Sequence, residues 1–160
     1  MNIARAKKVV FALIVFLVVI QFVQQRRTNP IAAPSRSLAA RVRAPAGVYS
    51  SLIRSCGDCH SNQTHWPWYS HVAPISWIVI DDVNEGRRHM NFEDWEVLED
   101  SKQANDRIID ICKEVKQNDM PPFSYRWVHR ELALKPQEIA LFCGWSQAFR
   151  TNPAGSGSHA

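Results

Sequence analysis

The sequence predicts an all-α protein, and three observations carry this prediction. No run of alternating apolar and polar residues is long enough to indicate a strand. Residues 101–117 place apolar side chains on one stripe at helical spacing, as expected for a helix packed on a core. Prolines and glycines divide much of the remaining chain into segments of helical length. With 160 residues, we expect a single folded domain.

The N-terminal part has the pattern of a membrane anchor. Residues 9–25 carry no charge and lie between Lys7–Lys8 and Arg26–Arg27, a length at the short end for a helix that crosses a bilayer. A cleaved signal peptide has a similar basic start and apolar core, but no small-x-small cleavage site follows the run directly. We therefore expect a single transmembrane signal anchor at residues 9–25, preceded by a basic cytoplasmic N-terminus at residues 1–8.

Charge is distributed unevenly along the chain. Residues 1–46 hold eight Lys and Arg and no acidic residue, whereas the rest has eleven basic and fifteen acidic residues, a net charge of −4. A nucleic-acid-binding protein is expected to have a basic face on its folded part, so this sequence argues against nucleic acid as a partner. Residues 26–46 are rich in Pro, Ala and Ser, and we expect them to form an extended tether.

The folded domain is expected at residues 47–150, followed by a disordered Gly/Ser-rich tail at residues 151–160. Its first helix should begin near Val48, because apolar residues recur there at i, i+4 spacing. An aromatic loop is expected over residues 61–74.

Further along the chain, residues with known preferences at helix ends mark the boundaries. Pro74 should begin a helix that Gly86 ends. Asn91 or Asp94 could cap a helix through Leu98. After the helix at 101–117 comes a loop, and Pro136 begins the last helix.

The motif that predicts chemistry is Cys56-Gly57-Asp58-Cys59-His60. Two cysteines two residues apart, with histidine directly after, are typical of covalent c-type haem attachment. One helical turn can present both thiols to the vinyl groups of one porphyrin, and His60 can bind the iron from the proximal side. A zinc site would need a second Cys or His pair, whereas Cys112 and Cys143 stand alone. A thioredoxin-like dithiol would need a βαβ pattern, which is not visible.

Met120 is the preferred distal ligand of the iron. It lies 60 residues after His60, in a segment followed by Pro121-Pro122, so the chain has enough length to reach the other face of the ring. A thioether opposite histidine is an established cytochrome c pairing that raises the reduction potential. The alternative ligand is His71, which would give a bis-histidine haem of lower potential.

Aromatic and basic residues are candidates for the haem pocket. A haem would offer the thirteen aromatic side chains of residues 47–150 a large apolar surface on which to pack. Guanidinium groups can pair with the haem propionates. Outside the cytoplasm a disulfide between Cys112 and Cys143 is possible, but each is expected on an apolar helix stripe, and we favour unpaired buried thiols. The predicted pocket residues are Trp66, Trp68, Tyr69, Trp77 and Arg87.

Two patterns conflict over the compartment. More basic residues follow the apolar run than precede it, which by the positive-inside rule would keep the domain in the cytoplasm. Covalent haem attachment instead implies the outer face of a bacterial inner membrane. We give the haem motif more weight and expect a single-pass protein with its haem domain in the periplasm.

Several different short motifs follow one another along the domain. They are Cys56–His60 with Ser61-Asn62, Thr64 with Trp66–Tyr69, Ala73-Pro74, Ser76-Trp77, Asp82–Arg87, Asn91-Phe92 and Met120–Pro122. Together they resemble the bacterial haem-binding domain family of monohaem, cytochrome c-like proteins, over about residues 48–148. The resemblance implies one haem held covalently at Cys56 and Cys59, His60 as proximal ligand, a small helical fold, and a distal methionine most plausibly at Met120.

These patterns predict a membrane-anchored monohaem c-type cytochrome that carries single electrons, alone or as a subunit of a larger electron-transfer complex. Its acidic domain would dock to basic patches on redox partner proteins. A labile sixth ligand would instead give a peroxidase-like haem enzyme or a redox or gas sensor, with His71 or His129 near the iron. The sequence leaves this alternative open.

Overall fold

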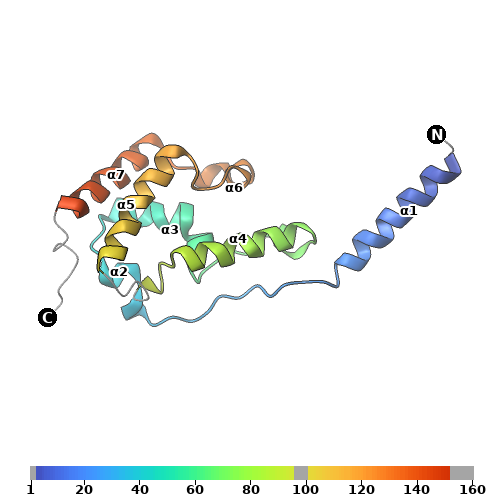
Figure 1. Cartoon of the computed structure of the whole chain (residues 1–160), viewed down its shortest axis with the longest axis horizontal. Helices are drawn as coiled ribbons and strands as arrows, with labels where there is room; N and C mark the ends of the chain where they lie inside the picture. Colours follow the sequence, from blue (N-terminus) through green and yellow to red (C-terminus); the bar gives the residue numbers. More distant parts are fainter. Residues whose placement is uncertain (1–2, 96–100, 152–160) are drawn as a thin grey trace.

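The computed structural model describes residues 3–95 and 101–151, and within these ranges the chain is helical without any strand. The all-α prediction is confirmed. Figure 1 shows one N-terminal helix standing apart from the group formed by the others. The elements are α1 (Ile3–Ile20), η1 (Pro34–Arg36), α2 (Leu38–Arg41), α3 (Ala46–His60), η2 (Trp68–His71), α4 (Ile75–His89), α5 (Ser101–Gln117), α6 (Phe123–Val128), η4 (Arg130–Leu132) and α7 (Pro136–Thr151).

The helix α1 covers only part of the predicted anchor. It begins at Ile3 and ends at Ile20, five residues before Gln25, and it includes three basic residues. Each large apolar side chain from Val9 to Val19 is exposed. Among the described residues, no helix combines the length and the apolar character that crossing a membrane requires.

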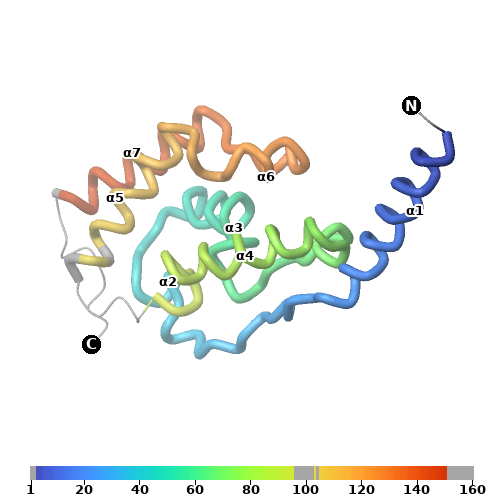
Figure 2. The backbone as a smooth tube through the Cα atoms, turned by 45° about the vertical axis from the view of Figure 1, so that its right-hand side comes forward, coloured from blue at the N-terminus to red at the C-terminus, as the bar shows by residue number. Residues whose placement is uncertain are grey.

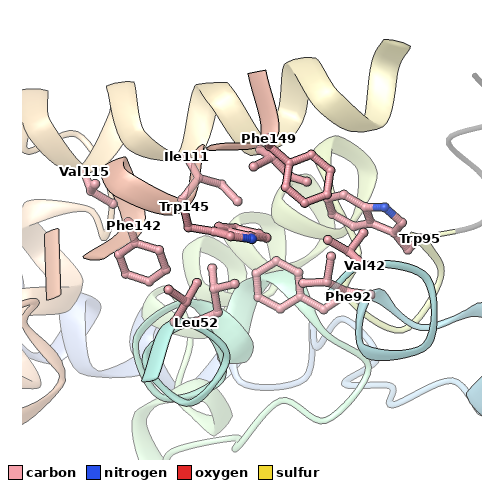
Figure 3. Close-up of a cluster of buried hydrophobic side chains, with 12 residues drawn as sticks. Val42, Leu52, Phe92, Trp95, Ile111, Val115, Phe142, Trp145 and Phe149 are labelled. Carbon is pink, nitrogen blue, oxygen red and sulfur yellow. The ribbon is translucent and has the colours of Figure 1, made fainter. Parts of the chain in front are cut away.

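The core lies where α7 contacts both α5 and α3. Figures 1 and 2 both show α5 and α7 side by side, with α3 and α4 as a second pair. The apolar stripe predicted for residues 101–117 forms one wall of this core, and α5 has the predicted bounds. Figure 3 shows aromatic rings of α7 between α5 and Leu52 of α3. The buried cluster consists of Leu38, Val42, Val48, Leu52, Phe92, Trp95, Ile108, Ile111, Val115, Phe142, Trp145 and Phe149.

Two helices differ from the sequence prediction. The helix α4 continues through Gly86 to His89, and the Met90 amide donates to the Gly86 carbonyl at its end. The segment after Pro122, expected to be a loop, forms the short helix α6. The helix expected from residue 91 or 94 through Leu98 lies partly outside the described residues, at 96–98, and residues 91–94 do not form a helix.

The predicted tether is bound to the domain. Leu38 and Val42 are 0% and 6% exposed and belong to the core. Residues 21–29, here called the strap, run along the domain and make hydrogen bonds to it. Prolines and small residues indicated an extended chain, but the composition does not reveal where such a chain docks.

Cys112 of α5 and Cys143 of α7 form a disulfide, with their Cα atoms 4.9 Å apart. The prediction that these thiols are unpaired is therefore wrong. Both cysteines do lie on apolar helix stripes as expected, but those two stripes face each other. Cys56 and Cys59 are free thiols.

Candidate functional site

The last turns of α3 carry the cysteines and the histidine of the motif. Cys56 and Cys59 are one helical turn apart, so their side chains lie on the same side of the helix. His60 is the last helical residue, and Ser61 leaves the helix with extended backbone angles. The helix thus ends directly where the motif ends.

These residues line a cavity of about 390 Å³. This volume falls in the range of roughly 300–1,000 Å³ that is usual for ligand and cofactor pockets. The cavity lies between α3, α4, α5 and the segment that follows α5. Most of its wall is apolar, through Leu52, Ile111, Val115 and Pro121. The charged residues that line it are Asp58, Asp82, Glu85, Arg107, Asp110 and Glu114.

His60 is held in the form that a metal ligand requires. Its Nδ1 donates to the Met90 carbonyl at 3.0 Å, which leaves Nε2 without the proton and free to coordinate. Burial lowers the pKa of the imidazole, although its hydrogen bonds to Met90 and Gly86 act in the other direction. The ring stacks on Phe92, with 5.9 Å between ring centroids and an interplanar angle of 30°. The environment therefore fixes both the tautomer and the orientation of a neutral imidazole.

The two thiols are protonated at neutral pH. Burial and then the neighbouring Cys59 raise the pKa of Cys56 to about 12. Burial and then Asp82 and Asp58 raise the pKa of Cys59 to about 12 as well. Reactive dithiols depend on a lowered thiol pKa, so this environment disfavours a thioredoxin-like redox pair. In the described ranges, no group of three or more His, Cys, Asp or Glu residues is placed to hold a metal ion.

Met120 lines the same cavity as His60. Helix α5 ends at Gln117, and Asn118 follows with a positive φ of 65°, a conformation that Asn tolerates. The amides of Asp119 and Met120 then donate back to the Glu114 carbonyl. This turn returns the chain to the cavity. His71, the alternative distal ligand, is exposed on η2 and does not line the cavity.

The five predicted pocket residues lie elsewhere. None of them is among the residues that line the cavity. Trp68 is 77% exposed, and the Trp77 Nε1 donates to the Val23 carbonyl of the strap at 2.6 Å. The Trp66 Nε1 likewise donates to Asn29 Oδ1 of the strap at 3.3 Å. The Tyr69 hydroxyl is hydrogen-bonded to His129 Nε2 at 2.5 Å.

The Arg87 guanidinium is occupied by protein groups. It donates to the Ser61 carbonyl at 2.8 Å, to the Thr28 carbonyl at 2.7 Å and to Thr64 Oγ1 at 2.7 Å. It also donates to Asn29 Oδ1 at 3.1 Å. Arg87 thus connects the strap to the loop that follows His60.

Sequence reasoning missed several residues of the site. Tyr125 lines the cavity, and its hydroxyl donates to Asp58 Oδ2 at 2.6 Å. Ser55 also lines the cavity, is 3% exposed, and its hydroxyl has no hydrogen-bond partner in the described structure. Gly86 contacts the backbone of Cys59. Ser55 had a local signal, its position directly before Cys56, whereas Gly86 and Tyr125 lie far from the motif in sequence.

The donor set suits a haem. The cavity brings together two free thiols at CxxCH spacing, a neutral imidazole with an open Nε2, a thioether, apolar walls and an unpaired hydroxyl. Each of these groups has a partner on a haem. The thiols match the vinyl groups, the imidazole and the thioether match the iron, the apolar walls match the ring, and the hydroxyl matches a polar edge. The residues present therefore fit this cofactor.

Fold and site together define a small helical protein built to hold a haem. The chain belongs to the haem-binding domain family, whose model matches residues 15–148. The resemblance predicted from the sequence motifs is confirmed. Comparison with curated proteins and with solved structures gives no match.

Proposed function

We propose that this protein is a monohaem c-type cytochrome that carries single electrons between redox partners. The observation that carries the proposal is the common cavity of Cys56, Cys59, His60 and Met120. Cys56 and Cys59 would hold the haem through thioether bonds, and His60 and Met120 would bind the iron. When bound, the haem supplies one-electron redox chemistry.

The protein side of this function is to hold the ligands and limit water. The Met90 carbonyl and the Phe92 ring keep His60 in one orientation, so the ligand does not need to rearrange between oxidation states. Apolar side chains of α3 and α5 cover much of the cavity wall. They would keep water away from the haem, which suits electron transfer. Two fixed ligands favour a carrier over an enzyme, because substrate chemistry at iron needs an open coordination position.

The charge distribution supports docking to basic partners. The chain from residue 47 onward carries eleven basic and fifteen acidic residues, and Asp82, Glu85 and Asp110 line the cavity. Charge complementarity of this kind steers weak, salt-sensitive encounters. We infer that the partners present a basic surface to the cavity side of the domain.

We also propose that the haem domain works on the periplasmic side of a bacterial inner membrane, with residues 9–25 as its anchor. Two observations support this location. The apolar side chains of α1 from Val9 to Val19 are exposed and have no cover from the described domain. The Cys112–Cys143 disulfide is typical of an oxidising compartment.

Absorption spectra of the purified haem-loaded protein test the proposed function. We expect low-spin ferric and ferrous spectra, a thioether–iron band and no change on adding carbon monoxide. The colour should stay with the polypeptide in acid acetone. Extraction of the pigment would contradict covalent attachment, and rapid carbon monoxide binding would favour the enzyme or sensor alternative.

Substitution of the cavity methionines tests the distal ligand. Met120→Leu should abolish the thioether–iron band and lower the reduction potential. Met90→Leu is the matched control because Met90 also lines the cavity, and it should leave the band unchanged. If the band survives in Met120→Leu but is lost in Met90→Leu, the ligand assignment is wrong. A bis-histidine spectrum in the unmodified protein would make His71→Ala the next variant.

A further inference from the structure

One end of the domain has an exposed apolar surface that the haem site does not explain. Trp68, Val72, Ile75 and Ile78 are 77%, 40%, 47% and 63% exposed. They lie on η2, on the turn after it and on the first turn of α4, and η2 packs against α4. We call these four residues the docking face. An exposed apolar cluster of this kind marks an interaction surface more often than scattered single residues do.

Hydrogen bonds attach the segment that carries the docking face to the end of α1 and to the strap. Gln21, directly after α1, binds the backbone of Ala73 with both side-chain atoms: Nε2 donates to the carbonyl at 2.9 Å, and Oε1 accepts from the amide at 2.9 Å. The Arg27 Nη1 donates to the Ser70 carbonyl at 3.0 Å. Figure 1 shows the start of α4 next to the end of α1. The place where the apolar helix meets the domain is therefore also the place of the docking face.

Apolar exposure continues from α1 into the strap. Phe22 and Val23 are 85% and 62% exposed, and the Val23 carbonyl is held by the Trp77 indole. The exposed side chains of α1, of residues 22–23 and of the docking face thus lie on elements joined by hydrogen bonds. If only α1 were covered by lipid or protein, the apolar side chains of residues 22–23 and of the docking face would stay in water at the same end of the molecule.

We propose that the docking face lies in the interfacial layer of the lipid bilayer that holds α1. This inference rests on the proposed membrane attachment and adds a second contact to it. Tryptophan is the residue type enriched at the membrane–water interface, because its ring is apolar and its N–H is polar. Arg26 is exposed in the strap next to these residues, where it can bind a lipid phosphate.

A consequence is that the domain has one orientation at the membrane. The tether expected from composition would let the domain move, whereas the strap holds it at residues 70, 73 and 77. The docking face then keeps this end on the lipid. The cavity, which is lined by other parts of α3, α4 and α5, keeps a constant position relative to the bilayer.

Labelling from the lipid side tests the inference. The full-length haem-loaded protein is reconstituted in phosphatidylcholine–phosphatidylglycerol vesicles that contain a lipid with a photoactivatable diazirine near its headgroup. Labelled residues are mapped by mass spectrometry. We expect label on α1 and on the docking face, and none on Leu141 of α7, which is 52% exposed and serves as the internal control.

The labelling pattern distinguishes the proposed docking face from the proposed membrane attachment. Label on α1 without label on residues 68–78 overturns the docking face and keeps the membrane attachment. No label on either contradicts the attachment itself. Equal label on Leu141 and on residues 68–78 shows non-selective contact and also overturns the docking face.

A variant pair adds a second measurement. Ile75→Glu combined with Ile78→Glu places two charges on exposed positions and should reduce label on residues 68–78 several-fold, with an unchanged haem spectrum. Leu141→Glu, which places a charge on an exposed apolar position of α7, is the control and should leave that label unchanged. Equal labelling of residues 68–78 in both variants would overturn the inference.

Discussion

Gly86 of α4 lies directly against the peptide carbonyl of Cys59 on α3. A β-carbon at position 86 would be 2.6 Å from the Cys59 carbonyl oxygen and 3.1 Å from the Cys59 β-carbon. Only glycine allows this approach, and it occurs at one of the two thiols of the haem motif. The glycine therefore serves the contact between α3 and α4, in the interior of a helix that runs on to His89.

Gly86→Ala should destabilise the protein, because the added methyl group meets backbone and not a flexible side chain. We expect a loss of about 1–3 kcal/mol in the free energy of unfolding, measured by chemical denaturation. Gly144→Ala is the control, since nothing lies within 4 Å of the corresponding β-carbon on α7. That variant should gain about 0.5–1 kcal/mol from helix propensity. A stabilised Gly86→Ala protein would contradict the close contact.

The motif residues could be predicted from sequence because their chemistry sets their spacing. Cys56, Cys59 and His60 are adjacent in the chain, and any helix places them together. Met120 could be predicted to join them only through the length of chain between it and His60, together with the family resemblance. The structure places Met120 and His60 on one cavity.

The aromatic residues could not be placed in the same way. Trp68 and Trp95 have the same side chain, yet they are 77% and 3% exposed. Which of them packs inside depends on how η2 and the strap fold onto α4, and the local sequence carries no signal for that docking. Gly86 was misinterpreted for a related reason, because a glycine at a helix end and a glycine at a helix crossing look alike in sequence.

The disulfide between α5 and α7 should contribute strongly to stability. It closes a loop between residues 31 positions apart, and loop-closure entropy predicts about 3–4 kcal/mol for that length. Replacing both Cys112 and Cys143 by Ala should lower the unfolding free energy by about this amount while haem content stays unchanged. Dithiothreitol should destabilise the original protein and leave the double variant unaffected. Equal unfolding free energies of the original protein and the double variant would show that the disulfide does not form.

The pairing of these cysteines illustrates another limit of sequence reasoning. Each cysteine lies on an apolar stripe, which the helical periodicity predicts. Whether the two stripes face each other depends on the register between α5 and α7. That register is set by large side chains such as Phe142 and Ile111 packing together in the core, a tertiary property without a local signature.

Glu138 should give the fold a specific acid sensitivity. Its carboxylate accepts from Arg54 Nη2 at 2.6 Å, from Ser51 Oγ at 2.9 Å and from the Lys135 amide at 2.8 Å, and so joins α3 to the start of α7. Burial alone would raise the pKa of Glu138, but these hydrogen bonds and the Arg54 charge hold it below the usual range. A depressed pKa in the folded protein means stability that is present above the unfolded pKa of about 4.3.

Unfolding of the original protein and of Glu138→Gln should be compared across pH. At pH 7 the variant should be less stable by about 1 kcal/mol. This difference should decline below about pH 5 and vanish as the pH falls through the depressed pKa of Glu138. Glu131→Gln is the control, because the Glu131 side chain is 69% exposed. A difference that does not change with pH would show that the charge of Glu138 is not what stabilises the contact.

The unpaired hydroxyl of Ser55 should influence the haem potential. Ser55 lines the cavity next to Cys56, and an O–H dipole directed at the cofactor favours the reduced form, which carries one more negative charge. Ser55→Ala should therefore lower the reduction potential by about 20–60 mV, the equivalent of one lost hydrogen bond, in a spectroelectrochemical titration. Ser76→Ala is the matched control, because that hydroxyl is also buried without a partner in the described structure but does not line the cavity. It should leave the potential unchanged. Equal potentials for the two variants would mean that the Ser55 hydroxyl does not face the haem.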